Sequence, residues 1–250
     1  GIKIPILKLR ETDDTELKFL ADFIYGKVFY GYTLKQWQMS PEELDFSVSS
    51  RVPVSISHDD RYFQDTYQQL PKTGYTGLFE NLLKHKNIET VLEIDYKNIS
   101  NEISFNRLIF TGPIDEYFDF IHGRLPYRSL DFKFKSLNQK WYQETAQVNF
   151  PNEFEYTRIT EFKHFRNEDS EHTVIAFEYP QNFINGVNEP YYPIPQKRNE
   201  DILNKYLHDA EKLSNSVVFI GRLANYKYFN MDEIIGSSLI TFNKKIANFY

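Results

Sequence analysis

The stretch LDFKFKS, residues 130–136, decides the fold class of this chain. Apolar and charged side chains alternate along it: Leu130, Phe132 and Phe134 against Asp131, Lys133 and Lys135. This alternation is typical of a strand with one face buried and the other in water. Half-solvated strands of this kind belong to antiparallel sheets. The stretch therefore predicts an antiparallel sheet in the middle of the chain.

Two other stretches are predicted to be strands of the same kind. IETVLEIDY, residues 88–96, places every second residue on one face, and HTVIAFEYP, residues 172–180, is rich in β-branched and aromatic residues. RLIFTGPIDEYFDFIHG, residues 107–123, predicts a buried strand, a turn at Gly112 and a helix opened by Pro113. Residues 185–201 are the most loop-like region, which we interpret as an extended segment lining a cleft.

The beginning of the chain predicts helices. Apolar residues recur at helical spacing, with acidic residues before them and glycine after them: Leu17, Leu20, Ile24 and Val28, then Asp13 and Glu16, then Gly31. SPEE, residues 40–43, has the pattern of a capping box with proline at the first helical position. The segment from Tyr32 to Trp37 is therefore predicted to be a short connection between two helices.

The C-terminal part predicts a strand that ends at Gly221, a polar and aromatic loop, and a helix capped by Asn230 with Glu233 at its third position. The predicted class is α+β, with N-terminal helices, a central antiparallel sheet and this C-terminal strand-loop-helix. We divide the chain into a helical substrate-lid region (1–60), a mixed region with the sheet (61–215) and the C-terminal region (216–250).

Composition excludes several classes of function. The formal charge is −6 and the isoelectric point near 5.6, so the chain has no basic field for nucleic acid. It has no cysteine, which excludes disulfides and thiolate chemistry. No apolar run approaches the roughly 20 residues needed to span a membrane, and no leader opens the chain. We therefore expect a soluble cytoplasmic protein without a membrane or nucleic-acid partner.

Several catalytic motifs are missing. The six histidines have no metal-ligand spacing, and neither HExxH nor a nucleophile elbow is present. The glycines form neither GxGxxG nor a Walker loop, so the chain has no recognisable phosphate cradle. The 22 Phe and 18 Tyr are numerous, and tyrosine is suited to surfaces that are half apolar and half wet. Any nucleotide would have to be held by arginines and tyrosines.

Four arginines adjoin apolar and aromatic residues, where a desolvated guanidinium suits phosphate oxygens: Arg51, Arg128, Arg158 and Arg222. The plainer interpretation for each is a core-edge arginine paired with a carboxylate. Five tyrosines can likewise be interpreted either as ligand contacts or as core residues: Tyr62, Tyr191, Tyr192, Tyr226 and Tyr228. Taken singly, each tyrosine is more often a core or interface residue.

In this order, these clusters resemble the UDP-galactopyranose mutase family. The similarity runs from about Leu17 to the C-terminus, through the following blocks: GYTLKQW, SSRVPV, DDRYF, PKTGYTGLFENLL, IFTGPIDEYFDF, LPYRSLDF, VNFPNEFEYTRITEFKHF, FEYP, EPYYPIP and GRLANYKYFNMDEII. So many long blocks in family order make the resemblance specific to this enzyme family rather than to flavoproteins in general.

The resemblance implies an isomerase that interconverts UDP-galactopyranose and UDP-galactofuranose, the latter supplying cell-surface polysaccharide. Reduced FAD attacks the anomeric carbon through N5, so the cofactor carries the chemistry and no protein nucleophile is needed. Members of the family begin with a Rossmann-type FAD-binding segment, whereas this chain begins at Gly1 without the glycine-rich fingerprint. We therefore expect the C-terminal portion of a longer flavoprotein, inactive alone and not retaining FAD, whose C-terminal helix exposes an apolar patch to that segment.

The resemblance also implies roles for individual residues. Trp37 matches a mobile lid position, and Tyr32 and Tyr62 match residues that hold the uridine. Arg51 and Arg158 match the catalytic arginines that bind the diphosphate, and Tyr192 and Tyr228 match tyrosines that contact phosphate. Asn149 and Glu178 match polar residues near the sugar and flavin. The implied cofactor contacts are Arg222, Asn230 and Met231.

Two positions depart from the family pattern. Gln38-Met39 follows Trp37 where many members have glycine, and Phe229-Asn230 stands where the family has Tyr-Asp or Tyr-Asn. Both changes leave the details of lid and cofactor contacts open. A second hypothesis is a non-catalytic module that binds a nucleotide sugar or another protein through the same aromatic clefts. The sequence also leaves a homodimer open.

Overall fold

The computed structural model describes residues 2–59, 61, 64–166 and 168–247. The chain forms two compact units, one made of residues 1–57 and 107–250 and the other of residues 58–106. The predicted mixed region, 61–215, is thus shared between both units. Tyr62 lies outside the described residues.

The first unit begins with helices and a short two-stranded ladder. In chain order its N-terminal elements are β1 (Ile2–Ile4), α1 (Ile6–Leu9), α2 (Thr15–Ile24), a π-helical segment η1 (Tyr25–Tyr30), α3 (Gly31–Trp37), a 3-10 turn η2 (Pro41–Glu43), α4 (Phe46–Ser50) and β2 (Val54–Ile56). Asp14 caps α2 with its side chain, and β1 pairs antiparallel with β2. The capping box predicted at Ser40 and Glu43 is confirmed, but it opens the single turn η2.

The prediction of a connection at Tyr32–Trp37 is wrong, because the helix continues through Gly31. Gly31 has ordinary right-handed helical angles, φ −63° and ψ −41°, and begins α3. It is placed there by a close approach, since a Cβ atom on Gly31 would lie 2.5 Å from the carbonyl oxygen of Pro151. The helix ends instead at Trp37, where Gln38 takes a left-handed conformation with φ 56°.

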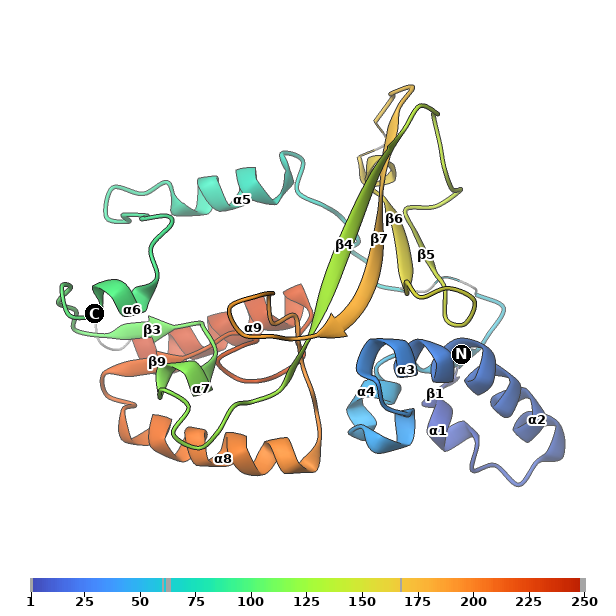
Figure 1. The fold of residues 1–250 in the computed structure, drawn as a ribbon, viewed down its shortest axis with the longest axis horizontal. Helices are drawn as coiled ribbons and strands as arrows, with labels where there is room; N and C mark the ends of the chain where they lie inside the picture. Colours follow the sequence, from blue (N-terminus) through green and yellow to red (C-terminus); the bar gives the residue numbers. More distant parts are fainter. Residues whose placement is uncertain (1, 60, 62–63, 167, 248–250) are drawn as a thin grey trace. The chain divides into compact units, whose positions relative to one another are not determined.

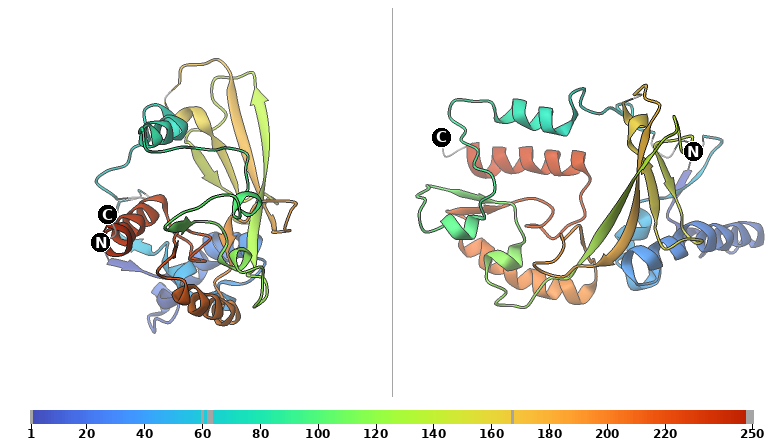
Figure 2. Two further views of the ribbon diagram at one scale, coloured as in Figure 1. Left: turned by 90° about the vertical axis from the view of Figure 1, so that its left-hand side faces the viewer. Right: turned by 45° about the horizontal axis from the view of Figure 1, so that its top comes forward.

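A five-stranded antiparallel sheet follows in the same unit, and the predicted α+β class is confirmed. Its strands are β4 (Tyr127–Leu137), β5 (Gln147–Asn149), β6 (Arg158–Glu161), β7 (Thr173–Asn182) and β8 (Tyr192–Pro193), in the spatial order β5-β6-β7-β4-β8. The two long strands, β4 and β7, form a twisted antiparallel pair along their whole length (Figures 1 and 2). Both were predicted from their sequence patterns.

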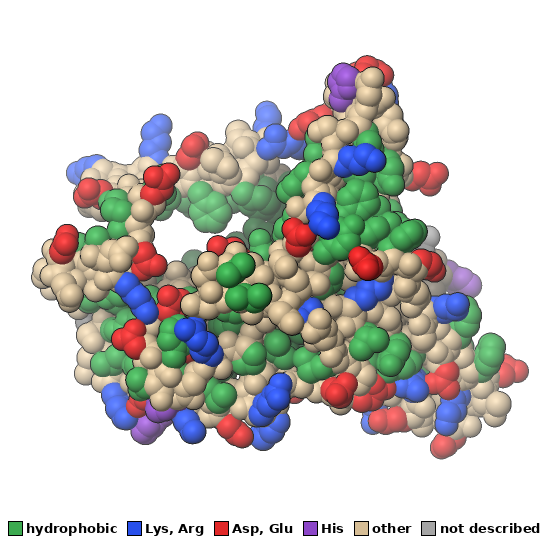
Figure 3. Space-filling model, in the orientation of Figure 1, with side chains coloured by type: hydrophobic (Ala, Val, Ile, Leu, Met, Phe, Trp, Pro, Cys, Tyr) green, Lys and Arg blue, Asp and Glu red, His purple; other side chains and the backbone are tan. Residues whose placement is uncertain are grey.

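Aromatic side chains form a ladder along this sheet. Phe132 lies between Tyr191 and Phe134, at 5.9 Å and 6.5 Å between ring centroids, and Phe134 stacks on Phe162 at 6.1 Å. Phe162 begins the 3-10 turn η3 (Phe162–Phe165) after β6. Figure 3 shows apolar side chains gathered over β4 and β7.

The remaining part of the first unit is built on two parallel strands, one before and one after the five-stranded sheet in the sequence. Its elements are β3 (Leu108–Phe110), α7 (Ile114–Tyr117), α8 (Lys197–Lys212), β9 (Val217–Phe219), α9 (Met231–Thr241) and the π-helical segment η4 (Phe242–Ile246). β3 and β9 pair in parallel (Figure 1), and the core beside them includes Ile114, Leu125, Tyr127, Tyr206 and Tyr226. The predicted capping box at Asn230 and Glu233 is present at the start of α9.

The second unit contains two helices, α5 (Gly74–Leu83) and α6 (Tyr96–Ile99). The strand predicted over residues 88–96 is wrong, because residues 88–95 form neither strand nor helix. Glu93 has φ 60°, a left-handed angle that interrupts an extended run. The side chains of residues 88–95 are also exposed, so the alternation does not mark a buried face.

Candidate functional site

The candidate site is built on three neighbouring strands whose register brings three polar residues side by side. Asn149 on β5 is paired with Arg158 on β6, and Arg158 is paired with Glu178 on β7. Directly paired residues of adjacent antiparallel strands project from the same face. The Arg158 Nε atom donates to the Asn149 Oδ1 atom at 3.0 Å, and its Nη1 atom lies 3.6 Å from the Glu178 Oε1 atom.

Helix α3 adds a tyrosine to this row. The Arg158 Nη2 atom donates to the Tyr32 hydroxyl oxygen at 3.4 Å. Burial raises the pKa of Tyr32, and the positive charge of Arg158 only partly opposes this rise. The hydroxyl of Tyr32 therefore stays protonated at neutral pH and can donate a hydrogen bond.

The ion pair in the row is loose. Burial raises the pKa of Glu178, against the opposing effect of Arg158. Burial also works to lower the pKa of Arg158, but Tyr32 and Glu178 outweigh it and the net pKa is raised. A separation of 3.6 Å exceeds the about 2.7–2.9 Å of a charge-assisted hydrogen bond. Arg158 therefore stays cationic without a tightly bound carboxylate, which suits an anionic ligand.

A second group of residues, the aromatic cluster, is formed by Trp37, Tyr192 and Tyr228. Their ring centroids are 6.0 Å apart for Trp37 and Tyr192, 6.4 Å for Trp37 and Tyr228, and 5.2 Å for the two tyrosines. The rings are steeply inclined to one another, as aromatic pairs prefer. Tyr192 comes from β8, and Tyr228 from the loop after β9.

Two arginines lie on the rings of the aromatic cluster. The Cζ atom of Arg51 is 3.9 Å from the ring centroid of Tyr228, and that of Arg222 is 4.9 Å from the same centroid. Arg51 also donates to the Asn230 side chain, and Arg222 donates to the Tyr191 carbonyl oxygen at 3.0 Å. These two cations thus meet aromatic faces and neutral acceptors, which leaves their positive charge uncompensated at these contacts.

The two groups influence each other electrostatically and form one site. Burial is the main cause of the raised pKa of Tyr192, and the neighbouring Tyr228, Glu178 and Tyr32 add to it, whereas Arg158 opposes it. Helix α3 joins the groups, since Tyr32 lies near its start and Trp37 at its end. The site therefore combines several cations and tyrosine hydroxyls on a partly buried wall, a set of donors suited to phosphate oxygens.

Most of the predicted substrate residues converge here. Trp37 is buried against Leu44 and Ile194, so its role as a lid over a base stays a prediction. Tyr62 lies outside the described residues. Arg128, an arginine candidate that was not a predicted substrate residue, is 1% exposed and donates to the Gln36 carbonyl oxygen at 2.8 Å and to Asn182. Arg128 therefore satisfies a carbonyl at the end of α3 and is not paired there with a carboxylate.

Sequence reasoning missed one residue of this neighbourhood. Lys35 donates from Nζ to the carbonyl oxygens of Phe150 and Tyr156 in the loop between β5 and β6. The spacing could have indicated this residue, because Lys35 follows Tyr32 by three residues and would share its face of a helix. It was missed because residues 32–37 were predicted to be a connection between helices.

The predicted cofactor residues lie after the parallel strands. Gly221 follows β9 with φ 117°, and a Cβ atom there would lie 3.4 Å from the carbonyl oxygen of Thr111, which follows β3. The turns after two parallel strands thus approach each other, at the carboxyl edge where such sheets bind cofactors. Asn230 caps α9, and Met231 begins the helix and is exposed. A helix start of this length carries partial positive charge, so Arg222, Asn230 and Met231 fit a cofactor with acceptor oxygens.

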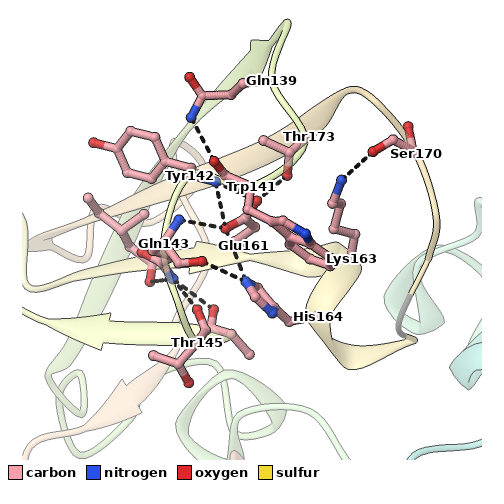
Figure 4. A network of polar contacts seen from close by, with 12 residues as sticks. Gln139, Trp141, Tyr142, Gln143, Thr145, Glu161, Lys163, His164, Ser170 and Thr173 are labelled. Atoms are coloured by element: carbon pink, nitrogen blue, oxygen red, sulfur yellow. Dashed lines mark hydrogen bonds and ion pairs between the residues drawn. The ribbon is translucent and has the colours of Figure 1, made fainter.

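A separate polar network surrounds Glu161, at the end of β6 (Figure 4). The carboxylate of Glu161 accepts from the backbone N–H groups of Tyr142 and Gln143 and from the Thr173 hydroxyl at 2.5 Å. The nearby hollow of about 450 Å³ is lined by Trp141, Tyr142, Gln143, Glu144 and His164. It contains none of the predicted substrate residues, and we assign the network a structural role.

The described part of the chain contains neither a metal-binding cluster nor a membrane-spanning helix. Within residues 2–59, 61, 64–166 and 168–247, no three His, Asp or Glu side chains lie close enough together to hold a metal ion. None of the helices in the same ranges combines the length and the apolar character needed to cross a membrane.

Comparison with known proteins gives a consistent result. The family model of UDP-galactopyranose mutase matches residues 27–228. A probable UDP-galactopyranose mutase of Klebsiella pneumoniae is 36% identical over 247 residues, which cover 97% of this chain and 64% of that protein. A dTDP-fucopyranose mutase of Escherichia coli is 37% identical, covering 91% and 62%. The UDP-galactopyranose mutase of Mycoplasma genitalium is 34% identical, covering 93% and 61%.

A crystal structure of reduced UDP-galactopyranose mutase has a similar fold, with a TM-score of 0.62 at 17% identity. The similarity covers 98% of this chain and 73% of that one. The chain thus spans 61–64% of the length of these curated relatives.

Proposed function

Because the chain belongs to the UDP-galactopyranose mutase family, we propose that it is the substrate-binding part of an enzyme that interconverts UDP-galactopyranose and UDP-galactofuranose. The observation that carries the proposal is the row of Asn149, Arg158 and Glu178 across three strands, joined by the Tyr32 hydroxyl. This row combines a cation, a carboxyl group, an amide and a hydroxyl group, and it offers both a charged donor for a diphosphate and acceptors for sugar hydroxyls.

Arg158 and Arg51 stabilise the diphosphate. The change of ring size breaks the bond from the anomeric carbon to O5 and forms one to O4. In the proposed reaction the bond between the anomeric carbon and the diphosphate oxygen breaks before this exchange and forms again after it. Negative charge gathers on the diphosphate while that bond is broken. Donors fixed in advance around developing charge are an effective means of lowering such a barrier. Arg158 is held in the row, and Arg51 lies on the ring of Tyr228.

The tyrosines and the other polar residues of the row orient the substrate. Tyr32 and Tyr192 have raised pKa values because of burial, so both stay protonated and donate to phosphate oxygens at neutral pH. Asn149 and Glu178 offer acceptors for sugar hydroxyls at the two ends of the row. None of these groups has to act as a nucleophile.

The cofactor of the proposed reaction is FAD, held on this chain by Arg222, Asn230 and Met231. When bound, reduced FAD supplies the nucleophile for the anomeric carbon. We further propose that the part of the relatives outside the match supplies the FAD-binding segment and packs on α9. Accordingly, the 250-residue chain alone should show no flavin absorbance and no turnover.

The nucleotide and the sugar require a direct test, because the relatives include both a UDP-galactopyranose mutase and a dTDP-fucopyranose mutase. The experiment is a calorimetric titration of the chain with UDP, and in parallel with dTDP. We expect UDP to bind. Arg158→Ala should weaken binding at least about tenfold, because a charge-assisted hydrogen bond contributes about 1.5–3 kcal/mol.

Arg166→Ala is the matched control, since Arg166 is exposed and its Nη1 atom lies 3.7 Å from Glu168, close to it in sequence. Its affinity should equal that of the unmodified chain. Tighter binding of dTDP would shift the proposed substrate to a thymidine nucleotide. Equal affinities for Arg158→Ala and Arg166→Ala would contradict the proposed site.

A further inference from the structure

Helix α3 is held against the loop between β5 and β6, residues 150–157, by the side chain of Lys35. The Nζ atom donates to the carbonyl oxygens of Phe150 at 2.5 Å and Tyr156 at 3.4 Å. These carbonyls lie near the two ends of the loop, so one ammonium group closes it. Burial lowers the pKa of Lys35, as expected for a cation that leaves water to meet carbonyl oxygens.

Two more contacts fix the same loop on the preceding turns of the helical segment. The Asn152 Nδ2 atom donates to the Lys27 carbonyl oxygen at 2.8 Å. Gly31 lies against Pro151, where a Cβ atom would come within 2.5 Å of the carbonyl oxygen. The helix and the loop therefore meet in one position, without room for a side chain between them.

The loop carries residues of the candidate site at both ends. Asn149 is the last residue of β5, and Arg158 is the first of β6. Tyr32, which accepts from Arg158, lies three residues before Lys35 on the same face of α3. Lys35 thus connects the helix that carries Tyr32 to the loop that ends in Asn149 and Arg158.

We propose that Lys35 is a positioning residue for the diphosphate site, which sets the Tyr32 hydroxyl against Arg158 by closing the loop between β5 and β6 on helix α3. This inference rests on the proposed function for its ligand. Lys35 acts through Tyr32 and Arg158, because its own donors are directed to the two loop carbonyls.

The first test is nucleotide affinity in the 250-residue chain. Lys35→Met keeps the length and the apolar part of the side chain but removes the donors, and UDP affinity should fall at least about tenfold. Lys35→Arg restores two donors in reach of the carbonyls and should recover most of that loss. Lys18→Met is the matched control, since Lys18 is exposed on α2, and its affinity should be unchanged.

The second test needs no nucleotide. The titration of Tyr32 is followed by NMR of tyrosine-labelled protein, with Tyr32→Phe to assign the signal. Burial is the main cause of the raised pKa of Tyr32. In Lys35→Met the helix loosens, so this pKa should fall towards its ordinary value of 10.0. In Lys18→Met and Lys35→Arg it should stay raised.

The two tests separate failure of the inference from failure of the proposed function. An unchanged Tyr32 titration in Lys35→Met would overturn the positioning role whether or not UDP binds. If the titration shifts but the unmodified chain binds no UDP, Lys35 still positions Tyr32 and the proposed ligand is wrong. If the titration shifts while UDP affinity stays constant, the contact does not serve the diphosphate site.

Discussion

Gln38 ends helix α3 in a conformation that glycine adopts more readily. Its angles, φ 56° and ψ 31°, are left-handed, and its side chain is exposed. Many helices end with a glycine in this conformation, because a Cβ atom is strained there. The family resemblance implies glycine at this position. This chain has Gln38 there instead, and its backbone still adopts the left-handed conformation that glycine favours.

Gln38→Gly should therefore stabilise the chain. We expect a gain of about 0.5–1 kcal/mol, since relief of left-handed strain exceeds the entropy that glycine adds to the unfolded chain. Urea unfolding measures the difference. Gln38→Ala keeps the Cβ atom and should show no gain. A glycine variant no more stable than the alanine variant would mean that the strain at this position is negligible.

Local context singled out Arg158 as one candidate among several, whereas Asn149 and Glu178 were predicted only from the family resemblance. Asn149 and Arg158 are nine residues apart in the sequence and Glu178 follows on a third strand, so their alignment depends on the register of two strand pairs. Register is set by the whole sheet, so local patterns do not reveal which polar residues become neighbours. Arg128 illustrates the converse, since its apolar context resembles that of Arg158 but it satisfies a carbonyl at the end of α3.

At the level of elements, alternation predicted β4 correctly and residues 88–96 wrongly, and β7 was predicted correctly from its β-branched and aromatic residues. β4 and β7 are paired with each other at ten residue positions. Residues 88–95 alternate in the same way, but they are exposed and Glu93 has a left-handed angle. A strand needs a partner as well as a pattern, and partners are not visible in a single stretch. Helix α8 was not predicted, because its first turn overlaps the loop-like residues 185–201.

The end of the sheet depends on Glu161. Its side chain is fully buried and joins β6 to the turn at Tyr142 and Gln143 and to Thr173 at the start of β7. Burial works to raise the pKa of Glu161, but the hydrogen bonds, with that of Thr173 the strongest, outweigh it and lower the net pKa. The ionised form therefore stabilises the folded chain at pH values above the ordinary glutamate pKa of 4.5.

Glu161→Gln should destabilise the folded chain by about 1.5–3 kcal/mol at neutral pH, because charge-assisted bonds are lost and the new amide N–H group meets other donors. The stabilisation by the carboxylate is lost as the pH falls through its lowered pKa, so the difference between the two proteins should shrink below pH 4.5. Urea unfolding across that range measures it. Glu144→Gln, at an exposed position of the same turn, is the control, and a difference independent of pH would contradict the assignment.

At the scale of the whole molecule, the candidate site is assembled from segments that span most of the chain. Tyr32 and Trp37 come from α3, Arg158 and Tyr192 from two strands of the sheet, and Tyr228 from the loop after β9. Local context singled out several arginines and tyrosines of the site as candidates, but it did not show which of them lie together. Helix α3 packs against the loop between β5 and β6 through the bare backbone of Gly31 and the side chain of Lys35, and neither contact leaves a periodic signal in the sequence.

Helix α9 presents an apolar row to solvent. Met231, Ile235 and Leu239 recur at helical spacing, the row continues to Phe242 at the start of η4, and Ile235 and Leu239 are 58% and 61% exposed. The sequence predicted an apolar patch around the C-terminal helix, and these exposures agree with it. That this face packs on an FAD-binding segment stays a proposal. Whether the apolar row is open to solvent in the present chain can be measured.

The double variant Ile235→Lys/Leu239→Lys should lower the fluorescence of an apolar dye at least about twofold, because exposed apolar patches bind such dyes. Its thermal midpoint should stay within about 3 °C, since exposed substitutions cost less than about 0.5 kcal/mol. Ile234→Lys is the matched control on the same helix, where the side chain is half-buried. The control should instead lower the midpoint by about 4 °C or more and leave the dye signal no lower. If the double variant behaves like the control, the row is packed within the chain and does not form an open surface.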